Sequence, residues 1–145
     1  MTHVALARGL LAFLSGAQGV GTLAIDLNRT HATNPQWTRH ARFHLVWQAI
    51  SHALLSLLEI PLVLAPGPFR EQRFYATAIL ASIPMLSFFA AVLCRKIYGG
   101  ALFDPNGILP LRLVVFGSER LIDLNLAVEV IALVMLLAIV ALFRL

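Results

Sequence analysis

Polar and ionisable side chains recur at helical spacing between residues 40 and 59, in an otherwise apolar stretch. At about 100° per residue they fall within an arc of about 120°, and they are His40, His44, Gln48, Ser51, His52 and Glu59. A histidine and a carboxylate that share a low-dielectric cavity form a general acid–base pair. This face therefore predicts proton-transfer chemistry within a membrane.

Two other apolar stretches carry polar residues at similar spacing. They are Ser15, Gln18, Thr22 and Asp26 in the first stretch, and Asp123, Asn125 and Glu129 in the last. Ionisable groups at membrane depth cost several kcal/mol unless they are paired or hydrated. We therefore expect the polar stripes to face one another inside a helical bundle.

The rise of about 1.5 Å per residue gives these groups a predicted depth. From the rim inward they are His31 and His40, then Asp26, His44 and Asp123, then Gln18, His52 and Glu129 at about 12–14 Å. This order predicts a polar funnel with a histidine–glutamate pair, His52 and Glu129, at its base. Glu59 is expected about 25 Å down, near the opposite surface and solvated.

The predicted roles follow from side-chain chemistry. His44 and His52 are expected to donate or accept the proton, while Asp26 and Glu129 orient them or stabilise a cationic intermediate; His40 completes the catalytic set. The predicted substrate-binding residues are Gln18, Trp37, Arg42, Phe43, Trp47, Gln48, Asp123 and Asn125. Within this set the aromatic side chains would shape the entrance, and Arg42 would hold a phosphate group or anchor the interface.

A metal site is the alternative for the same histidines. His40 and His44 are spaced i and i+4, which places both on one helical face, and His31 or Asp26 would supply a third ligand. Membrane di-iron hydroxylases resemble sets of eight or more histidines, whereas this chain has five. We therefore expect no bound metal and no cofactor.

Composition places the chain among integral membrane proteins. Of its 145 residues, 59% are hydrophobic and 12% are charged, against about 45–50% and 25% in soluble domains. Four stretches are long and apolar enough to span a bilayer, at about 9–27, 41–64, 74–93 and 121–143. We predict an all-α, single-domain bundle of four transmembrane helices over residues 1–145, with a funnel-shaped polar cavity. A lone cysteine, Cys94, excludes an internal disulfide.

The connections carry their own signals. Asn34 is expected to cap the second helix with Pro35 at its first position. The third connection contains "DPNG", a turn signal, and then "ILPLRLVVFG", which is too short to span and predicts a re-entrant or interfacial flap. Basic residues are more frequent on the side of the first and third connections, which predicts that this histidine-rich side is cytoplasmic.

A resemblance supports small-molecule chemistry. Residues 30–48, "THATNPQWTRHARFHLVWQ", resemble a signature of small four-helix membrane proteins of bacteria and fungi, approximately N-P-x-W-x-x-H-A-R/K-F-H. Association of some of these proteins with secondary metabolism implies a biosynthetic role. A broader similarity is to the EXPERA group of sterol isomerases and sterol binders, from which no residue is carried over.

We therefore expect an isomerase or cyclase (or a lyase) that performs redox-neutral acid–base chemistry on a hydrophobic small molecule, such as a secondary metabolite or lipid-like compound. The non-catalytic alternative is a binder or small transporter of hydrophobic or cationic ligands. The expected partners are the substrate and membrane lipids. Nucleic acid is not expected, because the net charge of +4 resides mainly at the ends of the spans. A homo-oligomer is left open.

Overall fold

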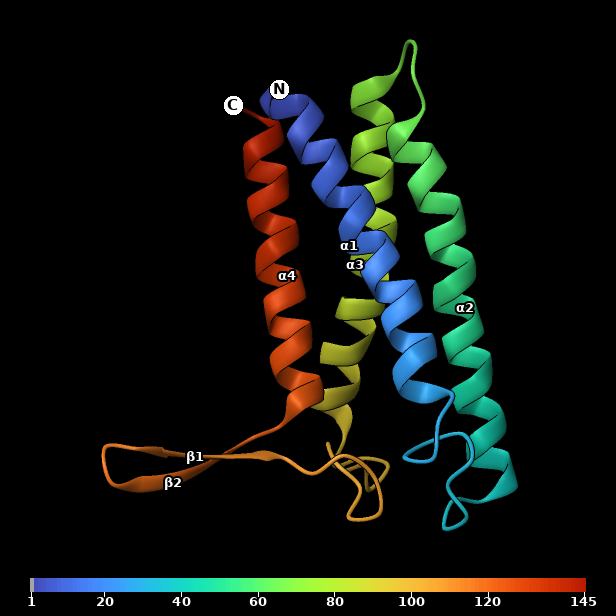
Figure 1. The fold of residues 1–145 in the computed structure, drawn as a ribbon, viewed down its shortest axis with the longest axis vertical. Helices are drawn as coiled ribbons and strands as arrows, with labels where there is room; N and C mark the ends of the chain where they lie inside the picture. The colour runs from blue at the N-terminus through green and yellow to red at the C-terminus, as the bar shows by residue number, and fades with distance from the viewer. Residues whose placement is uncertain (1) are drawn as a thin grey trace.

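The computed structural model describes residues 2–145 and contains four long helices (Figure 1). Their bounds are α1 His3–Asp26, α2 Arg39–Leu64, α3 Arg70–Cys94 and α4 Leu124–Phe143. All four are long and apolar enough to cross a membrane. The predicted all-α fold with four candidate membrane spans is therefore confirmed, and it is consistent with a multi-pass membrane protein.

The helices pack around α1. It contacts α2, α3 and α4, while α3 also contacts α2 and α4. Both chain termini and the α2–α3 turn lie at one end of the bundle, which we call the terminal end (Figure 1). The connections 27–38 and 95–123 lie at the other, which we call the histidine end. In Figure 1, α2 and α4 stand on opposite sides of α1, so their side chains have few opportunities to meet.

The start of α2 differs from the prediction. Thr38 is the N-cap, and its hydroxyl accepts a hydrogen bond of 3.1 Å from the backbone N–H of Ala41. Asn34 is 2% exposed and donates instead to the backbone carbonyl of Asn106, at 2.9 Å. The prediction that Asn34 caps the helix was wrong, because Asn34 holds two connections together and Thr38 is a competent cap nearer the apolar run.

The apolar core fills the terminal half of the bundle. It includes Leu11 of α1, Val63 of α2, Phe74 and Met85 of α3, and Ile139 of α4, all at most 3% exposed. The rings of Phe74 and Phe143 stack with centroids 3.8 Å apart. Apolar packing of these helices thus holds the terminal half of the bundle together.

An antiparallel hairpin leaves the histidine end just before α4. Strands β1 (Leu111–Val115) and β2 (Ser118–Ile122) project sideways past α4, away from the bundle (Figure 1). Phe116 at the turn is fully exposed and has a positive φ of 50°. The sequence predicted a non-spanning flap here but not its strands. The hairpin stays outside the bundle, which favours the interfacial form of that flap over the re-entrant one.

Candidate functional site

Helices α1 and α2 approach each other closely at Gly19. A Cβ added to Gly19 would lie 2.8 Å from the Cβ of Ser56 and 3.3 Å from the Cα of Ala53, so only glycine allows this approach. Ser15, one turn away on α1, is completely buried. Ser15 and Thr22 of the α1 polar stripe therefore lie against α2, as small residues at a membrane helix interface permit.

His52 is the histidine that this contact brings into the helix interface. Its Nδ1 lies 3.3 Å from the Thr22 hydroxyl of α1, which also donates to the Gln18 carbonyl at 2.7 Å. A hydroxyl has a single hydrogen, so once that hydrogen is used, the Thr22 oxygen accepts from an Nδ1–H of His52. The lone pair of the neutral imidazole then resides on Nε2, where it can accept a proton.

Asp26 is the carboxyl group that α1 places toward this histidine. It is half-buried at the end of α1 and lies one turn after Thr22, on the face that meets His52. Neither His31 nor His52 lies within 4.0 Å of the carboxylate as an ion pair, since the ion pair found within residues 2–145 joins Arg112 and Glu119. Asp26 and His52 therefore follow each other along the interface and do not form an ion pair.

Three polar residues in the first half of the predicted α2 face point outward. His40, His44 and Gln48 are exposed, as are the neighbouring rings of Phe43 and Trp47. Measured from His40 at about 100° per residue, the buried residues of α2 lie between about 100° and 180° around the helix. His52, at about 120°, lies within that buried sector and Glu59 at its edge, whereas His40 and His44 stand outside it. The expectation that the whole arc lines an interior cavity was wrong for this reason.

His40 and His44 form a pair on that outer face. Their Nε2 atoms are 3.0 Å apart, and His44 packs at 5.8 Å, between ring centroids, against both Phe43 and Trp47. Beside the pair, Phe43, Val46, Trp47 and Ile50 line a shallow apolar depression of about 370 Å³. Within residues 2–145 no third histidine, cysteine, aspartate or glutamate joins a metal-ligating group, so the third ligand of the metal alternative is not supplied by these residues.

Glu129 lies apart from His52. Its helix, α4, packs on α1 and α3, and its carboxylate oxygen Oε2 is buried with no hydrogen-bond partner among the described residues. The predicted pair of His52 and Glu129 is not formed, because equal depth on two helices does not make them neighbours.

Several predicted binding residues have structural contacts. The indole of Trp37 donates to Asp104 Oδ2 at 3.0 Å, and Arg42 Nε donates to the Trp37 carbonyl at 3.2 Å. Asp123 caps α4 by accepting from the N–H of Leu126. Asn125 donates to the Leu102 carbonyl at 3.4 Å. These contacts fix the connections at the histidine end.

Gln18 links two helices. Its side-chain Nε2 donates to the Ala81 carbonyl of α3 at 3.2 Å. Its backbone carbonyl meanwhile receives the Thr22 hydroxyl. Gln18 therefore holds α3 close to the turn of α1 that positions His52.

Glu59 is the buried group that sequence reasoning misplaced. It is 2% exposed, and it lies one turn after Ser56, whose hydroxyl donates to the Ser15 carbonyl of α1 at 2.6 Å. The prediction of a solvated Glu59 near the opposite surface was wrong, because α1 covers α2 along this length. The signal was available in the spacing, since Glu59 lies seven residues after His52 and three after Ser56, on the same face.

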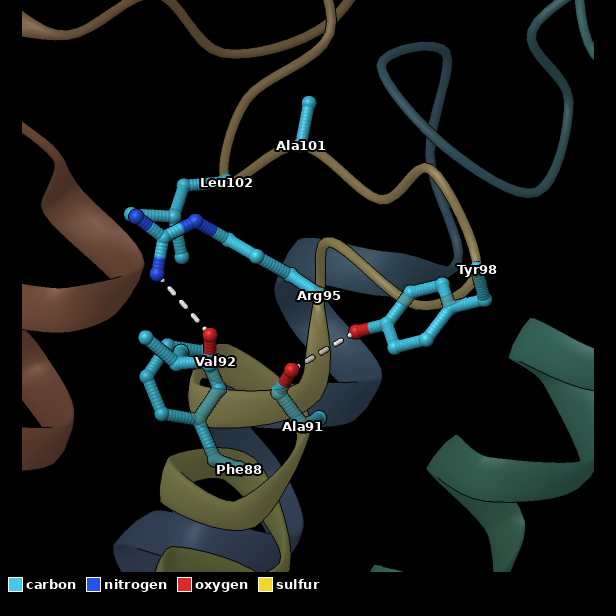
Figure 2. Close-up of a pocket in the computed structure, with 7 residues that line it drawn as sticks. All are labelled: Phe88, Ala91, Val92, Arg95, Tyr98, Ala101 and Leu102. Atoms are coloured by element: carbon cyan, nitrogen blue, oxygen red, sulfur yellow. Dashed lines mark hydrogen bonds between the residues drawn. The ribbon is translucent and has the colours of Figure 1, made fainter.

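A second hollow lies where α3 ends (Figure 2). It has a volume of about 170 Å³ and is lined by Phe88, Ala91, Val92, Arg95, Tyr98, Ala101 and Leu102. Figure 2 shows Arg95 and Tyr98 turned to opposite sides of the chain, where they donate to the carbonyls of Val92 and Ala91 at 2.8 and 2.9 Å. Both side chains are occupied in capping α3, so this hollow offers little free chemistry.

No protein-family model, curated protein or solved structure matches the chain.

Proposed function

We propose that the protein is an integral membrane enzyme that performs redox-neutral acid–base chemistry on a hydrophobic small molecule. His52 accepts and returns the proton, and Asp26 stabilises the imidazolium that forms. The supporting observation is the hydrogen bond between Thr22 and His52, which leaves Nε2 of a half-buried imidazole as the free base. The resemblance to membrane proteins associated with secondary metabolism adds a substrate class, a polyketide, terpenoid or lipid-like compound.

Isomerisation illustrates the chemistry. His52 Nε2 removes a proton from one carbon of the substrate, the double bond moves, and the imidazolium returns a proton to a second carbon. Atoms and electrons balance without an external oxidant or reductant. General acid–base catalysis of this kind contributes about 10²–10⁴-fold to a rate. Cyclisation and hydration use the same proton donor and are members of the same proposal.

The test uses a lipophilic β,γ-unsaturated ketone as the probe. Its conversion to the conjugated ketone is followed by ultraviolet absorption, and deuterium incorporation from D₂O is followed by mass spectrometry. We expect conversion by the purified protein in lipid vesicles and its loss in His52→Gln. His44→Gln is the matched control, because that imidazole lies on the outer face of α2 and should leave the rate unchanged.

Two other outcomes discriminate between functions. Loss of activity in His44→Gln but not in His52→Gln would move the reaction to the apolar depression beside Phe43 and Trp47. A stoichiometric transition metal in protein purified without a histidine tag would favour the metal-dependent alternative, with ligands beyond His40 and His44.

A second candidate function is binding or transport of a hydrophobic cation. The observation that favours it is the buried, unpartnered Oε2 of Glu129, since an unpaired carboxylate in a bilayer is suited to a cationic ligand. Binding of a lipophilic quaternary ammonium probe that is lost in Glu129→Gln, without turnover of any probe, would favour this function over catalysis.

A further inference from the structure

Glu59 lies deep in the bundle and carries no charge partner. It follows His52 by seven residues, which is about 10 Å along the helix axis, and its side chain is 2% exposed. The ion pair found within residues 2–145 does not involve it. An unpaired carboxylate at such a position is expensive, whereas the neutral acid is tolerated.

The cations on neighbouring helices are already bound elsewhere. Arg8 of α1 donates to the carbonyls of Val63 and Ala65 at 2.8 and 2.9 Å. Arg73 of α3 donates to carbonyls of the same α2–α3 connection. Both guanidinium groups lie at the terminal end, beyond Glu59. The other titratable groups along the α1–α2 interface, Asp26 and His52, lie toward the histidine end.

A buried hydroxyl on the facing stretch of α1 is suited to a protonated acid, since Ser56, one turn before Glu59, donates to the Ser15 carbonyl. The Ser15 side chain is completely buried, and its Oγ has no hydrogen-bond partner among the described residues. A carboxylic acid O–H can donate to that oxygen, while the serine hydroxyl donates in return. A protonated Glu59 therefore offers the Ser15 hydroxyl both a donor and an acceptor, whereas a carboxylate offers only an acceptor.

We propose that Glu59 and Ser15 form a proton-binding site inside the membrane, which exchanges protons with the histidine end along the polar α1–α2 interface. Ser56 stands next to the site, and its hydroxyl lies 2.6 Å from the Ser15 carbonyl and 3.1 Å from the His52 carbonyl. The Thr22 hydroxyl and the His52 imidazole follow along the same interface toward the histidine end. Asp26 lies there, where α1 ends.

The site is closed toward the terminal end. One turn beyond Ser15 and Glu59 lie Leu11 and Val63, which are 0% and 1% exposed and belong to the apolar core. Hydrocarbon side chains offer no group that passes a proton. The protein therefore loads and unloads this site from one side, as a proton store rather than a channel. The proposal stands apart from the catalytic role of His52, since it requires no substrate.

Infrared spectroscopy of the full chain in lipid vesicles tests the site. A protonated carboxylic acid has a carbonyl stretch that is separate from that of a carboxylate and shifts in D₂O. At neutral pH we expect such a band in the wild type and its loss in Glu59→Gln, an isosteric change. Glu129→Gln is the matched control and should retain the Glu59 component. Absence of any Glu59-dependent acid band would overturn the proposal.

The exchange path has its own measurement. After transfer into D₂O, the Glu59 band should shift quickly in the wild type and several-fold more slowly in His52→Phe and Thr22→Val. Leu11→Ala changes an apolar core residue outside the proposed path, so it should leave the exchange rate unchanged. A rate that is the same in all four proteins would show that protons reach Glu59 without this interface, and would overturn the path. Circular dichroism confirms that each variant remains helical.

Discussion

Trp37 and Asp104 are 67 residues apart in the chain and are joined by a hydrogen bond of 3.0 Å from the indole Nε1 to the carboxylate Oδ2. Asn34 makes a second link by donating to the Asn106 carbonyl at 2.9 Å. The "NPQW" segment and the "DPNG" turn thus hold each other at the histidine end. Trp37, which the sequence suggested as part of an active-site entrance, therefore helps to hold the two connections together.

Replacement of Trp37 by phenylalanine should destabilise this junction. The change keeps an aromatic ring but leaves Asp104 Oδ2 without its donor, which costs about 1–3 kcal/mol. We expect a lower thermal midpoint in detergent. Trp47→Phe is the control, because that exposed ring packs on Phe43 and His44; an equal loss in both variants would show that ring size matters and the hydrogen bond does not.

Sequence periodicity predicted the helices well but not which faces meet. All four spans were found because a long apolar run in a short chain has few alternatives. The polar arc of α2 was also real, yet only one edge of it, His52 and Glu59, is turned toward α1. That rotation is set by the close approach at Gly19, a tertiary contact between two helices, and no repeat within one helix encodes it. The separation of Glu129 from His52 is likewise set by tertiary packing, because α4 packs on α1 and α3.

Gly19 should be intolerant of any side chain. A Cβ there would lie 2.8 Å from the Ser56 Cβ, and overpacking of this kind costs about 1–3 kcal/mol. Gly19→Ala should therefore lower the denaturant midpoint, and a further Ser56→Gly change should restore part of it. Gly21→Ala is the matched control on the same helix, because its added Cβ meets nothing within 4 Å and alanine favours a helix by about 0.5–1 kcal/mol. Equal effects of the two alanines would contradict the close packing.

Thr22 should act on the reaction through His52. Thr22→Val removes the oxygen that accepts from Nδ1–H, so a smaller share of the imidazole carries its lone pair on Nε2. We expect slower probe isomerisation, with a loss smaller than the about 10²–10⁴-fold expected for His52→Gln. Thr22→Ser keeps the hydroxyl and should restore the rate. Failure of the serine variant to do so would indicate a packing role for the Thr22 methyl group.

The hairpin turn should rest in the membrane interface. Phe116 adopts a left-handed backbone conformation, which costs a non-glycine residue about 1–2 kcal/mol. Asparagine is better suited to such a turn position, so the backbone conformation does not explain the phenylalanine. An apolar ring at this exposed position is suited to contact with lipid. A spin label at Phe116→Cys, in a Cys94→Ala background, should collide more with oxygen than with a water-soluble nickel chelate. Glu119→Cys on the same hairpin should show the reverse, and a water-exposed label at position 116 would contradict interfacial placement.

Arg8 should be needed for its shape as well as its charge. Its guanidinium group donates through two nitrogens to the carbonyls of Val63 and Ala65, which end α2 without partners from their own helix. Lysine keeps the charge, and with it any influence on topology, but its single ammonium group cannot reproduce this geometry. We expect Arg8→Lys to lower the free energy of unfolding by about 1.5–3 kcal/mol, the range for a hydrogen bond to a charged group. Arg70→Lys is the control, because Arg70 is an exposed residue at the start of α3. If both lysine variants unfold at the wild-type midpoint, charge alone stabilises the terminal end, and the carbonyls of α2 are satisfied without Arg8.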